Sequence, residues 1–153
     1  MKKWLILISV LSFCVLMGFV YMTVPKHIDE NFKGYVFSKE HKLIKEVPVK
    51  LKGNRYNTFG NEMKFEGVIE IDGNSKKIKS TGSIFTEIDN SKYFFASNFA
   101  NSNNSEGVNE VSTCVIISKD FKILFGFTPG LVSKYGERSY FKTNKDLETF
   151  LDK

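Results

Sequence analysis

An uncharged apolar run near the N-terminus limits what this chain can fold into more than any other feature. Residues 4–24, a stretch of 21 residues, contain no Asp, Glu, Lys, Arg or His. A helix of that length rises about 1.5 Å per residue and spans roughly 30 Å, the thickness of the hydrocarbon core of a bilayer. Pro25 then ends the helix, because proline has no amide hydrogen to continue the ladder. The sequence therefore predicts a transmembrane anchor at residues 4–24, after a cytoplasmic tail of residues 1–3.

Cys14 lies inside the run and raises two alternatives to a permanent anchor. A cleaved signal has an apolar region of about 7–15 residues followed by small residues, but here apolar residues continue beyond Ser12, where the best candidate cleavage site lies. Lipid attachment needs a small residue before the cysteine, and Phe13 occupies that position. The sequence favours an uncleaved anchor with Cys14 as a small apolar side chain, and secretion after cleavage is the alternative.

Charges on the two sides of the run predict how the anchor is oriented. Lys2, Lys3 and the α-amino group favour a cytoplasmic N-terminus. Long segments cross the membrane largely regardless of charge, so less weight falls on the lysines that follow the run: Lys26, Lys33, Lys39 and Lys42. We expect a single-pass protein of the cell membrane with a cytoplasmic N-terminus and an extracellular C-terminal domain.

The rest of the chain, about 128 residues, is long enough for one domain with its own core. It carries 20 Lys and Arg against 17 Asp and Glu, a net charge of +3, and residues 26–55 alone hold eight basic and four acidic side chains. We predict a basic tether at residues 25–43, which either contacts anionic lipid headgroups or is simply solvated. An extracytoplasmic β-domain is expected at residues 44–153.

Hydrophobic residues recur with a period of two through this domain, as is typical of half-buried strands. The inward-facing positions of two of the predicted strands are Val47, Val49, Leu51, Phe65, Gly67, Ile69 and Ile71. About seven short strands separated by turns, one of them at residues 128–131, predict an antiparallel meander that forms a small barrel or a curved sheet. Residues 143–152 combine a capping-box-like start with one apolar face and predict a short C-terminal helix. The expected fold class is mainly β, with a transmembrane helix before the meander.

The residues of the domain do not support catalysis or cofactor binding. Both histidines, His27 and His41, precede the predicted domain, so Cys114 would have a catalytic partner only if the tether folded back, and we interpret it as a packed thiol. No CxxC, HxH or HExxH spacing marks a metal site, and no glycine-rich phosphate loop is present. With 20 lysines and two arginines, the chain is poor in the side chain that best reads phosphates and guanine. We predict that it is not an enzyme and binds no cofactor, metal or nucleic acid.

Two features remain as candidates for ligand binding. Lys76, Lys77 and Lys79 gather beside a hairpin turn, where they either present a cationic face to an anionic envelope polymer or lipid, or form a solvated edge on which lysine prevents aggregation. Tyr93 and Phe95 belong to the aromatic segment "KYFFASNF", which either lines a cavity for a lipid or peptide or packs as core.

These observations predict an extracytoplasmic binding protein of the bacterial envelope, held in the lipid bilayer by residues 4–24. Its partner would be an anionic envelope polymer, a lipid or another protein. The alternative is a small membrane subunit or immunity-type protein that acts through its transmembrane helix. Small residues of the run, Ser9, Ser12 and Gly18, would let a second helix approach closely.

Overall fold

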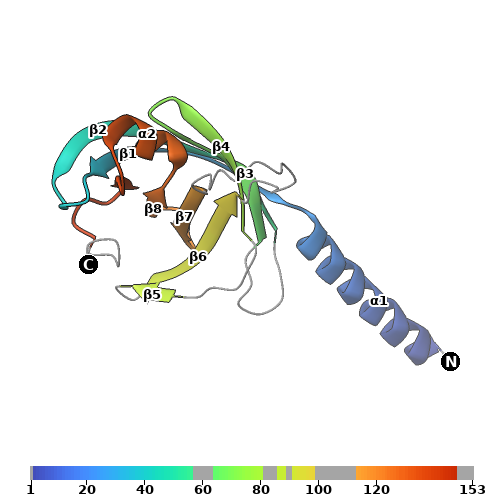
Figure 1. Cartoon of the computed structure of the whole chain (residues 1–153). Helices are drawn as coiled ribbons and strands as arrows, with labels where there is room; N and C mark the ends of the chain where they lie inside the picture. The colour runs from blue at the N-terminus through green and yellow to red at the C-terminus, as the bar shows by residue number, and fades with distance from the viewer. Residues whose placement is uncertain (1, 57–63, 81–85, 89–90, 99–112, 148–153) are drawn as a thin grey trace, which may run out of the picture.

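The computed structural model describes residues 2–56, 64–80, 86–88, 91–98 and 113–147, which form two helices and nine strands (Figure 1). The elements in chain order are α1 (Lys2–Thr23), β1 (Lys26–Phe37), β2 (Leu43–Tyr56), β3 (Lys64–Ile71), β4 (Asn74–Ser80), β5 (Thr86–Ile88), β6 (Ser91–Asn98), β7 (Thr113–Ser118), β8 (Leu124–Phe127), α2 (Pro129–Tyr135) and β9 (Tyr140–Lys142). The strands gather into one β-domain, and α1 projects away from it.

Eight of the strands close into an antiparallel barrel. Each pairs with its neighbours in the order β4-β3-β2-β1-β9-β8-β7-β6, and β4 pairs with β6 to complete the ring. The closing contact is short, since it consists of Lys79 opposite Ser97 and Ser80 opposite Ala96. β5 pairs with β6 further along that strand, on the same edge as β4. The predicted mainly β meander behind an apolar helix is confirmed, and it takes the form of a barrel.

Side chains that alternate along the strands fill the barrel interior. Val47, Val49 and Leu51 of β2 are buried, whereas the residues between them are exposed. Three aromatic rings pack against one another inside, with centroid distances of 6.4 Å for Phe65–Phe94, 5.3 Å for Phe65–Phe121 and 5.4 Å for Phe94–Phe121. The same cluster includes Ile28, Val36, Ile69, Ile71, Ile78, Ala96, Val115, Ile117, Leu124, Leu131 and Phe141. The interior is a packed core, as expected for a barrel of eight strands.

Two facing glycines make room for one of the aromatic rings. Gly53 of β2 and Gly67 of β3 are directly opposite each other, and a Cβ on either would lie 2.7 Å from Cζ of Phe65. The ring of Phe65 therefore lies across this pair, where a larger residue would displace it. Glycine inside a strand often marks such a close approach.

The predicted basic tether at residues 25–43 is wrong, because Lys26–Phe37 is strand β1 and pairs with both β2 and β9. Ile28, Gly34 and Val36 are buried and Phe32 is partly buried, while the charged side chains of the strand are exposed. A barrel strand keeps one face in water, so its charges do not prevent it from pairing. The β-domain begins at Lys26 rather than at residue 44, and only Val24 and Pro25 separate it from α1.

Residues 128–131, predicted as a turn, instead begin helix α2. Thr128 is the N-cap, and its Oγ1 accepts a hydrogen bond from the amide of Leu131 at 3.3 Å. Pro129 takes the first helical position, which suits its fixed φ and its missing amide hydrogen. The helix inserts Leu131 into the barrel core.

Asp72 in the β3–β4 turn ties α2 to the barrel. Its carboxylate accepts hydrogen bonds from Nζ of Lys134 and, at 2.6 Å, from the hydroxyl of Tyr135. These bonds, first that of Lys134 and then that of Tyr135, hold the pKa of Asp72 below its usual value. A seven-residue helix needs such tertiary contacts, because a helix this short is unstable alone.

The helix predicted at residues 143–152 does not begin where it was expected. Residues 143–147 contain bends and a turn, and residues 148–152 lie outside the described residues. Leu147 is buried against the outer face of the barrel. The short helix near the C-terminus is α2.

Candidate functional surfaces of the helix and the barrel

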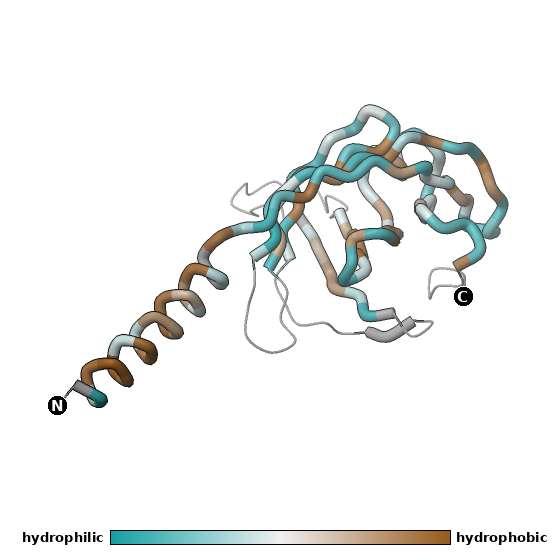
Figure 2. The backbone as a smooth tube through the Cα atoms, turned by 180° about the vertical axis from the view of Figure 1, so that it is seen from behind, coloured by the Kyte–Doolittle hydropathy of each residue, from teal (hydrophilic) through white to brown (hydrophobic). Residues whose placement is uncertain are grey.

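Helix α1 consists mostly of apolar residues along its length, as its mostly brown colour in Figure 2 shows. From Trp4 to Tyr21 its large apolar side chains are between 49% and 71% exposed. Of the helices that the structure describes, it alone is long and apolar enough to cross a membrane, over Lys3–Tyr21. Trp4 and Tyr21 mark its two ends and are residue types enriched at membrane–water interfaces. A membrane anchor and a signal sequence both have these properties.

The barrel rim next to α1 brings together two like charges. Lys26 of β1 and Arg55 of β2 are directly opposite in the ladder. The guanidinium of Arg55 lies over the ring of Phe121, 5.9 Å from its centroid. Its Nε is buried and has no hydrogen-bond partner among the described residues. Arg55 is therefore a cation held at the rim with an unused donor.

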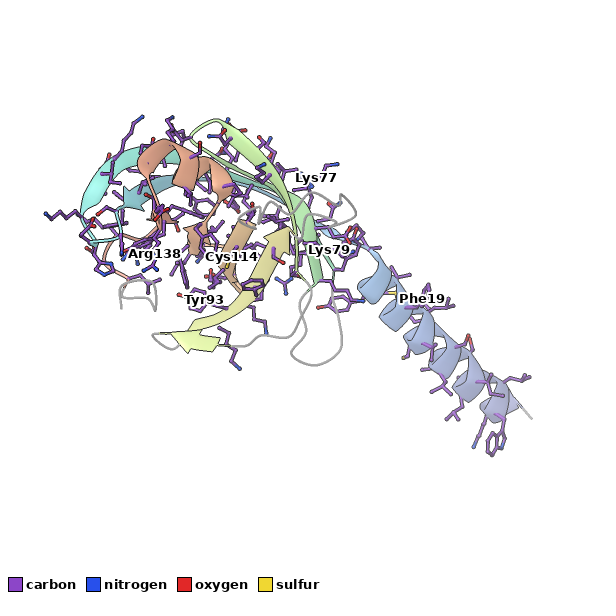
Figure 3. The ribbon with its side chains drawn as sticks, viewed as in Figure 1. Phe19, Lys77, Lys79, Tyr93, Cys114 and Arg138 are labelled. Atoms are coloured by element: carbon purple, nitrogen blue, oxygen red, sulfur yellow. The ribbon has the colours of Figure 1, made fainter. Side chains whose placement is uncertain are left out.

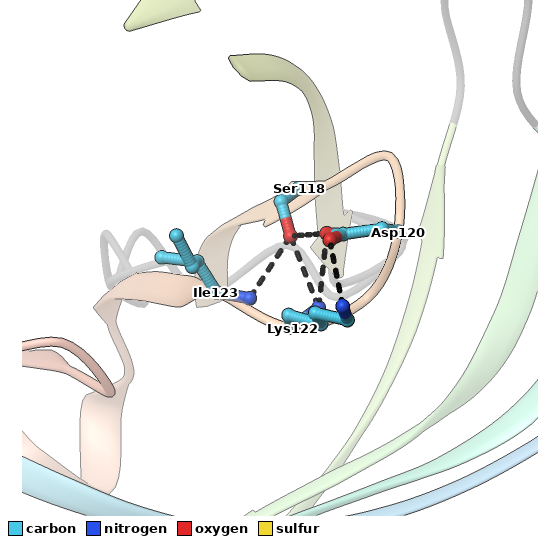
Figure 4. Close-up of polar contacts among 4 residues, drawn as sticks. All are labelled: Ser118, Asp120, Lys122 and Ile123. Carbon is cyan, nitrogen blue, oxygen red and sulfur yellow. Dashed lines mark hydrogen bonds and ion pairs between the residues drawn. The ribbon is translucent and has the colours of Figure 1, made fainter. Parts of the chain in front are cut away.

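Phe121 reaches this rim because the β7–β8 turn is closely hydrogen-bonded (Figure 4). Ser118 Oγ donates to Asp120 Oδ1 at 2.6 Å and accepts from the amides of Lys122 and Ile123 at 3.1 and 2.9 Å. Burial opposes ionisation of Asp120, but the hydrogen bonds from Ser118 and the Lys122 amide outweigh it and lower the pKa of Asp120. Phe121, with φ of 61°, can then turn its ring into the barrel core.

The lysines predicted as a cationic face belong to a surface of mixed charge. Lys76, Lys77 and Lys79 are exposed on β4, and Figure 3 shows Lys77 and Lys79 on the side that faces away from the barrel. A hydrogen bond to Glu66, together with its negative charge, raises the pKa of Lys79. Ion pairs across β1–β4 join Lys33 to Glu46 at 2.7 Å, Lys52 to Asp29 at 3.0 Å and Lys79 to Glu66 at 2.5 Å. These acids reduce the positive potential of the face, and an anionic ligand stays a prediction.

Tyr93 and Phe95 lie on the outer face of β6, because Phe94 and Ala96 between and beside them face the interior. Tyr93 is fully buried there, and Phe95 is partly buried. They belong to a second apolar cluster outside the barrel, with Ile116, Ile123, Phe125 and Leu147. Tyr93 and Phe95 therefore pack against other side chains, which is one of the two interpretations of the segment "KYFFASNF", and do not line a cavity inside the barrel.

An open depression of about 360 Å³ lies along the β1–β2 hairpin. Its lining residues are Phe32, Lys33, Glu46, Val47 and Pro48. The walls come from two strands only, so a ligand there would keep much of its surface in water, unlike a ligand in an enclosed binding site.

The side chains that most often perform chemistry are packed or locally hydrogen-bonded. Burial raises the pKa of Cys114 to about 11, so its thiol is protonated at neutral pH. Nδ1 of His27 lies 3.3 Å from Oδ1 of Asn54, and Nδ1 of His41 lies 3.0 Å from the hydroxyl of Tyr140. Within the part of the chain that the structure describes, no three His, Cys, Asp or Glu side chains gather around a possible metal position.

Sequence reasoning missed the pairing of Lys26 with Arg55. The inward face of β2 continues from Leu51 through Gly53 to Arg55, so the period of two could have placed Arg55 on it. Nothing in the sequence marks Lys26 as its neighbour, because their pairing depends on the register of a hairpin in a segment predicted as a tether.

Comparisons with known proteins found no relative of this chain. No family model, no curated protein and no solved structure matches it.

Proposed function

We propose that this chain is a single-pass membrane protein of the bacterial envelope whose extracytoplasmic barrel binds a partner without catalysing a reaction. Helix α1 would lie in the bilayer, with the N-terminus in the cytoplasm and the barrel on the outer side. The observation that carries the proposal is the exposed apolar surface of α1, which only Val24 and Pro25 separate from a closed barrel. Moving apolar surface from water into lipid is favourable by about 25 cal/mol per Å².

The outer surface of the barrel is the part available for a partner. The interior is occupied by its own aromatic and aliphatic side chains, so a ligand would have to displace them. The outer face of β1–β4 instead carries exposed charges of both signs, including Lys77 and Lys79 of β4. Exposed charged surfaces support specific association through electrostatic complementarity. An anionic envelope polymer, a lipid headgroup or an acidic protein surface would each suit these lysines.

Protease shaving of intact cells that carry a C-terminal epitope tag tests the location. Loss of the tag from intact cells supports an extracytoplasmic barrel, whereas survival until lysis refutes it. Appearance of the tagged chain in the medium would mean that α1 is removed as a signal sequence. Lysed cells are the control, since they show that the folded barrel can be cut at all.

Action through α1 itself is the second candidate, favoured by one observation on the helix surface. Apart from its chain neighbours and the backbone of α1, no atom of the described residues lies within 4 Å of the position of a Cβ on Gly18, so a neighbouring helix could approach there. Replacing residues 4–24 with an unrelated anchor separates the two functions. A binding barrel should retain its activity after this exchange, and a helix-dependent subunit should lose it.

A further inference from the structure

The two like charges at the rim next to α1 face each other on one side of the sheet. Alternation from buried Ile28 places Lys26 on the inward side of β1, and alternation from buried Leu51 does the same for Arg55 in β2. The two residues are directly opposite in the register. Side chains so placed start about 4.5–5.5 Å apart at Cβ, and like charges in this position destabilise a sheet.

Two acids of the surrounding strands are engaged elsewhere, and Glu30 of β1 forms no ion pair with another described residue. Asp29 pairs with Lys52, and Glu66 pairs with Lys79. Asp120, in the turn that supports Arg55 through Phe121, accepts hydrogen bonds from Ser118 and from the amide of Lys122. Among the described residues, none of these carboxylates forms an ion pair with Lys26 or Arg55.

Arg55 has a donor that lacks an acceptor. Its Nε is buried without a hydrogen-bond partner in the described part of the chain, although its guanidinium is supported on one face by the ring of Phe121. Most buried polar groups are hydrogen-bonded, and a buried donor without an acceptor destabilises the fold. An anion between Arg55 and Lys26 would supply the acceptor and turn the repulsion of two cations into attraction for one ligand.

The position of the rim relative to α1 indicates which anion lies close enough to bind Lys26 and Arg55. Lys26 is the third residue after Thr23, the last residue of α1. Three residues span at most about 11 Å, and the headgroup region extends roughly 5–8 Å beyond the hydrocarbon core on each side. Figures 1 and 2 show β1 leaving the helix directly into the barrel. The rim therefore lies at the depth of the lipid phosphates when α1 crosses a bilayer.

We propose that Lys26 and Arg55 bind the phosphate group of an anionic phospholipid. A guanidinium offers a planar pair of donors that matches phosphate oxygens, and an ammonium adds a point charge. Anionic headgroups are preferred over zwitterionic ones because the rim offers two cations to a single ligand. The site rests on the membrane anchoring part of the proposed function, but not on the side of the membrane or on the partner of the barrel.

The test uses the full chain in nanodiscs made of equal parts of phosphatidylcholine and phosphatidylglycerol. Lipids that stay bound after ejection from the disc are counted by native mass spectrometry. The wild-type chain should retain more phosphatidylglycerol than phosphatidylcholine. Arg55→Gln and Lys26→Gln should each reduce this preference roughly tenfold, as expected for loss of a charge-assisted contact. Arg55→Lys should retain part of it. Lys42→Gln removes the same charge from the exposed turn of the β1–β2 hairpin, at the end of β1 farthest from Lys26, and should leave the preference unchanged.

Equal retention of both lipids by the wild type, or an unchanged preference in Arg55→Gln and Lys26→Gln, would overturn the site. Thermal unfolding provides a second measurement if Arg55→Gln is poorly folded, since phosphatidylglycerol should raise the Tm of the wild type but not that of Lys26→Gln. Inorganic phosphate is added in a separate arm. If the chain binds inorganic phosphate but shows no preference for phosphatidylglycerol in phosphate-free buffer, the ligand is free phosphate and the lipid assignment fails. A chain that does not stay in the discs refutes the membrane anchor instead, so the two failures are distinguishable.

Discussion

Strands β1–β4 and strands β6–β8 share one interior but differ in what covers their outer faces. Along β2, buried residues alternate with exposed charged ones. Along β7 and β8, nearly every residue is buried, because Tyr93, Ile116 and Phe125 form a second cluster outside the barrel that Leu147 covers. One half of the barrel is a sheet with a solvated face, and the other is enclosed between two apolar layers. Stability should therefore depend on both faces of β6–β8 but on only one face of β1–β4.

The largest loss of stability should come from the interior that the two halves share. Phe65→Ala removes a ring that packs against Phe94 and Phe121, and it should lower the free energy of unfolding by about 3–5 kcal/mol. Chemical denaturation of the full chain measures this change. Val68→Ala, on the exposed face of the same strand, is the matched control and should change it by less than about 0.5 kcal/mol. Equal effects of the two substitutions would contradict the assignment of interior and exterior on β3.

The outer face of β7 should respond more strongly than the outer face of β3. Ile116→Ala opens a hole in the second cluster and should cost about 2–5 kcal/mol in the free energy of unfolding. Leu147→Ala should be non-additive with it, with a coupling of about 0.5–3 kcal/mol in a double-mutant cycle. If Ile116→Ala is as mild as Val68→Ala, or if the two losses simply add, the C-terminal segment does not cover this face in solution.

How far the sequence predicts the fold differs between the two halves. In β2 and β3 the period of two identified the inward faces, since Leu51 lies between two lysines and Phe65 lies between Lys64 and Glu66. In β6 both faces are apolar, so the sequence predicted burial of Tyr93 or a cavity but could not say which side was inside. β1 was missed because its charged residues resemble a linker, although Ile28 and Val36 keep the barrel period. Long-range features such as the Lys26–Arg55 pair depend on strand register, which the alternation of residue types does not specify.

Acid should loosen the attachment of α2, which is a smaller and local effect. The pKa of Asp72 is lowered by its bonds to Lys134 and Tyr135, so their stabilising contribution is present above the ordinary value of 3.8 and is lost as the pH falls below it. The protection factors of the amides in residues 131–135, which correct for the intrinsic pH dependence of exchange, should fall several-fold more at low pH than those of the barrel strands. In Asp72→Asn the same amides should have lower protection factors already at neutral pH and should show little further change on acidification. Protection factors that follow pH equally in wild type and variant would contradict the role of this carboxylate.

Substitution of the exposed lysines of β4 should have the smallest effect on stability and the largest effect on binding. Replacing Lys76, Lys77 and Lys79 together by Gln removes exposed charges and one ion pair, and exposed pairs contribute little to stability. The denaturation midpoint should stay unchanged, while binding of the full chain to dextran sulfate, as a model anionic polymer, should weaken and become less dependent on salt. Replacing Lys119, Lys122 and Lys145 together by Gln removes three exposed charges outside β1–β4 and controls for the loss of net charge. Undiminished binding by the β4 variant would move the search for a partner away from the outer face of β1–β4. Weakened binding at an unchanged midpoint would show that this solvated face is available for recognition because the fold does not depend on it.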